Sequence, residues 1–215
     1  LGREQIVIDR SQGYIGVLID DLVTKDNHEP YRMMTSRSEY RLLLRQDNAD
    51  QRLTPVGYQV GLISKERYQK LQTKVRLIDE EKQRLEETMV GASPKIQAFL
   101  ESHESSTLKT AASLAEILRR PEMKYEYLKE IDEEYPDLPY EVTEQVEIDI
   151  KYDGYIKRQL KQVEQFKKLE EKRIPDDIDY DQINSLRIEA VQKLKLCKPI
   201  SIGQASRISG VSPAD

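Results

Sequence analysis

The stretch YEVTEQVEIDIKYDGYIKRQLKQVEQFKKLEEK, residues 140–172, decides the fold class of this chain. It contains no proline, and its apolar residues recur at roughly helical spacing. These residues are Val142, Val146, Ile150, Ile156, Leu160 and Val163. The stretch is acidic toward its N-terminus and basic toward its C-terminus, which is the charge order that a helix macrodipole favours. We predict one long helix from about Tyr140 to Lys172, ended by Pro175.

Cap residues and prolines mark further helices on both sides of this stretch. The predicted helices are Tyr14–Val23, Thr54–Gly61 with Thr54 as N-cap and Pro55 at the first position, Ser64–Met89, Ser93–His103, Ser113–Pro121, Met123–Ile131, Ser185–Leu196, Ser201–Ser209 with Gly210 as its cap, and a helix start at Ser212 and Pro213. Gln5–Asp9 reads as a short strand. The mostly apolar Tyr14–Val23 segment needs a neighbour to cover it. The prediction is a mainly α, multi-helix fold.

Composition limits the classes of protein that this chain can belong to. Its 215 residues are 38% hydrophobic and 34% charged, which predicts thin cores and broad helix surfaces. It shows no signal peptide and no apolar run of about 18 residues, so we expect a soluble, cytoplasmic protein. The single cysteine, Cys197, excludes an internal disulfide. We expect Cys197 to pack at a helix end rather than to act as a nucleophile.

The net charge of −5 hides two segments of opposite sign. Residues 126–150 hold ten acidic side chains against Lys129 alone. Residues 151–173 hold eight basic side chains and four acidic ones. Because electrostatic steering depends on where charge lies, an acidic total does not exclude nucleic-acid binding.

A second basic segment is EPYRMMTSRSEYRLLLRQDNADQRLT, residues 29–54, with five arginines. If Ser36 caps a helix and Glu39 closes a capping box, then Arg37, Arg41 and Arg45 share one face. Arg32 and Arg52 flank that face. Guanidinium groups suit phosphate, and a row of like charges repels itself unless an anion lies across it. The alternative is a face that is solvated or paired internally with Glu39, Asp47 and Asp50.

The segment IKYDGYIKRQ, residues 150–159, combines rings with cations. Tyr152 and Tyr155 offer base stacking, and Gly154 lets another backbone come close. Phosphate contacts are predicted for Lys151, Lys157 and Arg158. The alternative is that the tyrosines pack the helix core, the lysines are solvated and the glycine has no explanation. Since a glycine inside a helix costs about 1 kcal/mol, we favour the functional interpretation.

Other chemistry has little support in the sequence. His28 and His103 lack partners at metal-ligand spacing, so we predict no metal site. Asp20 and Asp21 are adjacent and point in different directions on a helix, which favours capping or ion pairing over acid–base catalysis. We predict no catalytic and no cofactor-binding residue. Arg207, in the tail IGQASRISGVSPAD, is a further phosphate-seeking candidate on a small helix-turn-helix-like unit.

Four stretches together resemble one family: YIGVLIDDLVTK (14–25), residues 29–54, IKYDGYIKRQ (150–159) and IGQASRISGVSPAD (202–215). The family is MnmG (GidA), the FAD-binding subunit of the enzyme that places a carboxymethylaminomethyl group on the wobble uridine (U34) of certain tRNAs. No G-x-G-x-x-G phosphate cradle occurs in this chain. The resemblance therefore implies the C-terminal part of such an enzyme, without the flavin domain.

The resemblance also implies an organisation and partners. Residues 1–53 would be a remnant abutting the flavin domain, 54–173 a helical domain, and 174–215 a small, truncated helical subdomain. The family implies tRNA and the tRNA modification GTPase (MnmE) as partners, and a homodimer for the whole enzyme. FAD and the reductant NADH would bind in the absent part, so this chain alone is expected to carry no cofactor and to be inactive. The rival hypothesis is a helical adaptor without nucleic-acid binding.

Overall fold

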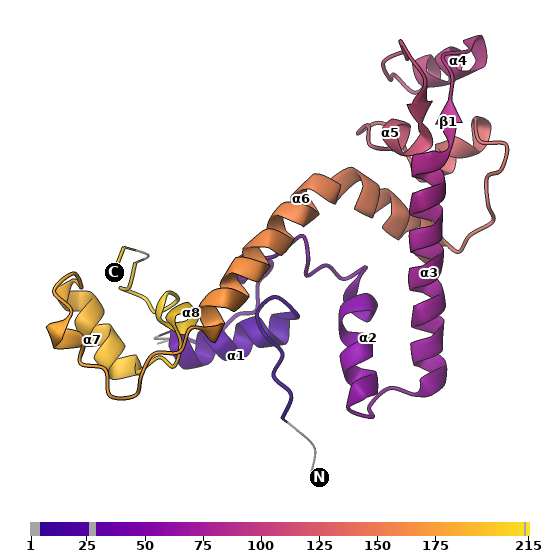
Figure 1. Cartoon of the computed structure of the whole chain (residues 1–215). Helices are drawn as coiled ribbons and strands as arrows, with labels where there is room; N and C mark the ends of the chain where they lie inside the picture. The colour runs from indigo at the N-terminus through magenta and orange to yellow at the C-terminus, as the bar shows by residue number, and fades with distance from the viewer. Residues whose placement is uncertain (1–4, 26–28, 213) are drawn as a thin grey trace. The chain divides into compact units, whose positions relative to one another are not determined.

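The computed structural model describes residues 5–25, 29–212 and 214–215. His28 and Pro213 lie outside the described residues, so the predictions that concern them are not addressed. Contacts divide the chain into two compact units: Leu1–Leu44 with Lys157–Asp215 (unit 1), and Arg45–Ile156 (unit 2). The division into 1–53, 54–173 and 174–215 stays a prediction. The described residues are mainly helical (Figure 1), as the sequence predicts.

Unit 2 consists of helices and one pair of very short strands. Its elements are α2 (Ala49–Gln59), α3 (Lys65–Glu87), β1 (Met89–Val90), α4 (Pro94–Ser102), β2 (Ala112–Ser113), α5 (Leu114–Leu118), the 3-10 helix η2 (Tyr125–Glu130) and the N-terminal half of α6 (Tyr140–Glu171). α2 lies alongside α3 (Figure 1). The large buried side chains Leu85, Leu100 and Leu118 belong to one core, which Val146 of α6 joins. α6 confirms the predicted long helix.

Local capping explains three helix starts in unit 2. The Ser64 hydroxyl accepts a hydrogen bond from the Arg67 amide at 3.3 Å and begins α3. Ser93 begins α4 in the same way, followed by a proline at the first position. Ser113 and Glu116 form the predicted capping box of α5, with distances of 3.1 and 2.9 Å. These predictions are confirmed because a cap is set by neighbours three residues away.

Tertiary packing overrides several other predictions. α2 begins at Ala49, so Pro55 lies inside the helix and Thr54 is a buried side chain rather than a cap. The segment 123–131 forms the 3-10 helix η2 rather than an α-helix. Strands β1 and β2 were not predicted: they pair antiparallel over two residues each, too few to show a period of two.

Unit 1 is built around two small cores. Its elements are α1 (Tyr14–Thr24), the 3-10 helix η1 (Thr35–Arg37), the C-terminal half of α6, the 3-10 helix η3 (Tyr180–Gln182), α7 (Ile188–Cys197) and α8 (Ile202–Ala205). Val17, Tyr40, Leu44 and Val163 form one core. The other contains Ile174, Tyr180, Leu194, Ala205 and Ile208. α1 confirms the predicted helix, and several of its apolar side chains remain exposed, including Ile19 and Val23.

The predicted helix over Arg37–Arg45 is wrong. Only Thr35–Arg37 is helical, as one 3-10 turn, and Ser36 makes no capping hydrogen bond. Tyr40 and Leu44 are both buried in the core with Val17. Gln5–Asp9 is also not a strand, and no described strand pairs with it.

The C-terminal predictions are right in type and imprecise in length. α7 begins at Ile188, not at Ser185. α8 is capped by Ser201 as predicted but ends at Ala205, before the turn at Gly210. Gly210 has φ +95°, a left-handed conformation that favours glycine, but it lies beyond the end of α8, whose C-cap is Ser206, so the predicted cap is wrong.

Candidate nucleic-acid interface

The middle of α6 presents two tyrosines to solvent. Tyr152 is 45% exposed and Tyr155 is 59% exposed, so neither belongs to the core. Between them, a Cβ added at Gly154 would meet nothing within 4 Å. Packing within the described residues therefore does not require the glycine. The exposure of both rings argues against the interpretation in which the tyrosines pack the helix core. It favours the interpretation in which they form part of a binding surface.

The three cations of this segment differ in their surroundings. Lys151 is partly buried, pairs with Glu147 at 3.0 Å and also donates to the Met123 carbonyl. Lys157 and Arg158 are exposed on the helix. Lys151 thus has a structural task in unit 2, whereas Lys157 and Arg158, about two turns later, lie at the surface.

The five arginines of residues 29–54 do not form one row. Arg32 and Arg41 are exposed and belong to unit 1. Arg37, also in unit 1, lies with its guanidinium carbon 4.9 Å from the centre of the Tyr31 ring. These three arginines are on irregular backbone or a single 3-10 turn, so helical spacing does not align them.

The other two arginines belong to unit 2 and have partners there. Arg45 pairs with Asp47 at 3.0 Å, as the alternative of internal pairing expected. Arg52 donates to the Asn48 side chain and to the Arg45 carbonyl, each at 2.9 Å. Asp47 is also bound by Gln145 of α6, and its pKa is lowered because hydrogen bonds from Gln145 and Arg45 outweigh desolvation. This arrangement fixes the start of α2.

A buried cation that the sequence analysis missed organises unit 1. Arg10 is 2% exposed and donates to Asp21 at 2.7 Å, to Asp20 at 3.0 Å and to Glu39 at 2.8 Å. Burial lowers the pKa of Arg10, but hydrogen bonds with Glu39 and Asp21 outweigh burial and raise it. Arg10 therefore stays charged. The ion-pairing role predicted for Asp20 and Asp21 is confirmed, and that pair of adjacent acids was the signal that a buried cation was needed.

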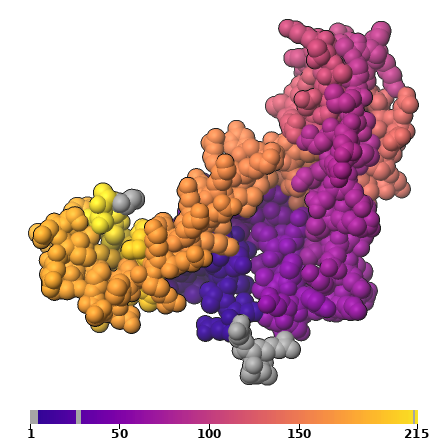
Figure 2. All heavy atoms as spheres, in the orientation of Figure 1, coloured from indigo at the N-terminus to yellow at the C-terminus, as the bar shows by residue number. Residues whose placement is uncertain are grey.

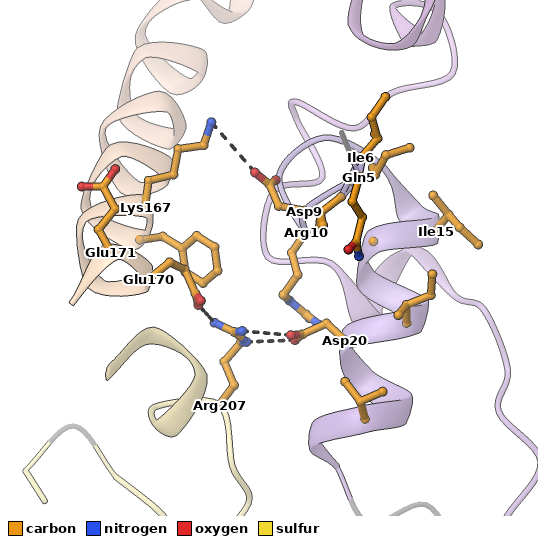
Figure 3. A pocket seen from close by; sticks show the side chains of 16 residues that line it. Gln5, Ile6, Asp9, Arg10, Ile15, Asp20, Lys167, Glu170, Glu171 and Arg207 are labelled. Atoms are coloured by element: carbon orange, nitrogen blue, oxygen red, sulfur yellow. Dashed lines mark hydrogen bonds and ion pairs between the residues drawn. The ribbon is translucent and has the colours of Figure 1, made fainter. Parts of the chain in front are cut away.

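Arg207 is held inside unit 1. Its guanidinium donates to both oxygens of Asp20 at 2.9 Å and to Glu170, and it lies 4.9 Å from the Phe166 ring centre (Figure 3). Desolvation lowers the pKa of Arg207, but the hydrogen bonds with Asp20 and Glu170 outweigh it and raise the pKa. This placement gives Arg207 a structural role within unit 1, and its role in phosphate binding stays a prediction.

A groove of about 760 Å³ lies beside these ion pairs, between α1 and the end of α6 (Figure 3). Its apolar wall includes Ile6, Ile15 and Ile19. The polar wall is rich in carboxylates, such as Glu171, and its arginines already bind carboxylates. Because Arg10 and Arg207 already bind carboxylates, neither guanidinium is available to a dinucleotide pyrophosphate, so the groove does not fit FAD.

The remaining candidates are Cys197 and His103, which were weighed as a nucleophile and a metal ligand. Cys197 is exposed at the end of α7, so the expected packing role is wrong. Among the described residues, no three His, Cys, Asp or Glu side chains gather as metal ligands. His103 stacks on Tyr127, with ring centres 4.2 Å apart. In the same part of the chain, no helix is both long and apolar enough to cross a bilayer.

Comparison with known proteins indicates one family. The family model described as the tRNA modifying enzyme MnmG/GidA C-terminal helical domain matches residues 65–160, and the one for the C-terminal helical bundle of the same enzyme matches 162–215. The tRNA uridine 5-carboxymethylaminomethyl modification enzyme MnmG of Lachnoclostridium phytofermentans is 64% identical over 214 residues, and that of Geobacillus kaustophilus is 56% identical over 215. Each alignment covers 100% of this chain and 34% of the relative.

A solved structure agrees with these relatives. Aquifex aeolicus GidA, in its form II crystal, matches with a TM-score of 0.76 and 42% identity, over 99% of this chain and 33% of that one. The chain thus spans about a third of the length of the proteins that it matches. It belongs to the MnmG/GidA family and corresponds to that family's C-terminal helical region.

Proposed function

We propose that this chain binds tRNA as the C-terminal region of an enzyme that forms 5-carboxymethylaminomethyluridine at the wobble position. The observation that carries the proposal is the surface of α6 formed by Tyr152, Gly154 and Tyr155 in unit 2. It offers two exposed rings and an open backbone within about one helical turn, and the exposed cations Lys157 and Arg158 follow in the sequence. Exposed rings beside cations suit single-stranded RNA, whose unstacked bases need a partner for their faces.

The exposed arginines of unit 1 supply further contacts in this proposal. Arg32 and Arg41 are exposed, and their guanidinium groups suit phosphate, so we expect both to bind it. Their spacing in the sequence does not contribute to this expectation. Lys157 belongs to the same basic part of α6. We propose a smaller contribution to tRNA binding from four further cations, because contacts within the chain hold each of them. They are Lys151, Arg37, Arg45 and Arg52.

The proposal extends to the whole protein through its relatives. The catalytic residues, FAD and NADH would belong to the part of the relatives that this chain does not match, since the groove in unit 1 suits no flavin. Docking of the GTPase MnmE, homodimer formation and a cytoplasmic location are likewise proposed from the family. This chain alone is then a binding region without activity of its own.

Replacement of Tyr155 by alanine tests the role of the exposed rings. If Tyr155 stacks on a base, Tyr155→Ala weakens tRNA binding by about 1 to 3 kcal/mol, which is roughly 5- to 150-fold in Kd. Tyr140→Ala is the matched control, because Tyr140 is a more exposed tyrosine on the same helix among acidic residues. Binding is measured by fluorescence anisotropy of a labelled tRNA transcript, and the melting temperature is measured for each variant.

Two outcomes would contradict the proposal. Equal affinities for Tyr155→Ala and Tyr140→Ala would show that the ring does not stack. No tRNA binding by the unmodified chain would favour the rival hypothesis of a helical adaptor.

A further inference from the structure

The outer face of the C-terminal half of α6 carries a regular row of long polar side chains. Arg158, Lys161, Gln165 and Lys168 follow one another at spacings of three, four and three residues, so they share one face of the helix. All four are exposed. Lys172 follows four residues later, just beyond the end of α6, and is also exposed. We call these five residues the α6 stripe.

The stripe faces away from the core of unit 1. On the other side of the helix, Val163 packs with Tyr40 in that core, and the rings of Phe166 and Tyr40 meet edge to face, with centres 6.3 Å apart. Gln159 on this inner side donates to the Glu39 carbonyl at 3.4 Å. The inner side is therefore occupied by the chain itself, whereas atoms of α6 lie at the surface along the helix (Figure 2).

The cations of the stripe form no ion pair within the described residues. There, none of the ion pairs engages Arg158, Lys161, Lys168 or Lys172. α3 shows the usual pattern instead, with Lys70 paired to Glu66 at 3.6 Å and Arg76 to Glu80 at 3.0 Å. Like charges three or four residues apart cost a few tenths of a kcal/mol each. The helix macrodipole favours cations only in the last turn, so it does not account for Arg158 and Lys161.

We propose that the α6 stripe is a track for the phosphate backbone of the RNA, an inference that rests on the proposed function. Arg158 to Lys168 spans about 15 Å along the helix, enough for several phosphates. Ammonium groups act as point charges on phosphates and read no base, so the track adds affinity without sequence specificity.

Charge reversal on the stripe tests this proposal. In the double variant Lys161→Glu and Lys168→Glu, the affinity for a tRNA transcript falls by roughly tenfold or more at about 0.1 M salt, and the slope of log K against log salt flattens by about 1.5. The control is Lys95→Glu with Lys109→Glu, which changes the net charge equally at exposed lysines of unit 2. A milder pair, Lys161→Gln with Lys168→Gln, gives a smaller effect in the same direction. Circular dichroism and melting temperature confirm folding.

The outcomes separate this inference from the proposed function. If the unmodified chain binds tRNA and the stripe variants keep its affinity and salt slope, the track is wrong while tRNA binding stands. Equal losses in the stripe and control variants also overturn the track, because they show that net charge alone matters. If the unmodified chain binds no tRNA, the proposed function fails and the track fails with it.

Discussion

At the scale of single residues, the chemistry of a side chain is predictable from sequence but its partner is not. Arg207 was a reasonable phosphate ligand by type, yet it binds Asp20, which lies 187 residues away in the chain. Arg10 was overlooked because its sequence signal, the adjacent acids Asp20 and Asp21, lies ten and eleven residues further on and does not say which cation they bind. In contrast, the exposed tyrosines and Gly154 agree with the sequence interpretation, since a glycine inside a polar helix has few local explanations.

The buried pair of Arg10 and Asp21 gives the first prediction. Asp21 is fully buried, and its pKa is lowered because hydrogen bonds from Lys25, Tyr31 and Arg10 outweigh desolvation. A carboxylate with a lowered folded-state pKa stabilises the protein fully above its unfolded pKa of about 4 and loses that effect as pH falls through the folded value. Asp21→Asn should lower the free energy of unfolding by about 3 kcal/mol at pH 7, because Arg10 loses a buried partner.

Urea unfolding at several pH values checks this prediction. Below about pH 4 the unmodified chain should lose stability more steeply than Asp21→Asn, so that the two converge. Parallel curves with a constant difference would show that Asp21 does not titrate as its contacts require.

Gly154 gives the second prediction, in which stability and binding change in opposite directions. Gly154→Ala should raise the free energy of unfolding by up to about 1 kcal/mol, because alanine favours the helix and its Cβ meets open space. The same methyl group should weaken tRNA binding if the RNA backbone approaches the helix there. Gly16→Ala is the contrasting variant, since its Cβ would collide with the backbone oxygens of Ile8 and Asp9, and it should destabilise. Thermal melts and anisotropy titrations measure both effects, and tighter tRNA binding by Gly154→Ala would oppose the proposal.

At the scale of elements, helix starts were predicted well wherever a local cap sets them. Ser64, Ser93 and Ser113 all act as N-caps. The prediction failed at Ser36 because a capping pattern there competes with long-range burial of Tyr40 and Leu44. The long helix α6 was found because its pattern extends over many turns, whereas β1 and β2 are too short to leave a pattern.

Two serine variants test this account of helix starts. Ser64→Ala should cost about 1 kcal/mol of stability, since the Arg67 amide loses its acceptor. Ser36→Ala should change stability by less than about 0.5 kcal/mol, because Ser36 is exposed and caps no helix. Both are measured by chemical unfolding. A similar cost for the two variants would indicate that Ser36 begins a helix in solution after all.

At the scale of the whole molecule, segregated charge matters more than the total. The acidic side chains gather in residues 126–150 and the cations in later turns of α6, so a chain of net charge −5 still presents a basic surface. The family was predictable because four separate stretches resemble MnmG. The relatives, which match over the whole chain, confirm that prediction. Which cations remain available to a ligand was not predictable, since that depends on the ion pairs that form on folding.

The most direct test of the central claim is a titration of labelled tRNA with this chain at several salt concentrations. We predict binding whose log K falls linearly with log salt, with a slope magnitude of about 3 or more, as expected if several phosphates each contribute about 0.7 to 0.9. Absence of binding at about 50 mM salt, or an affinity that does not depend on salt, would contradict the claim that this region holds tRNA through its basic surface.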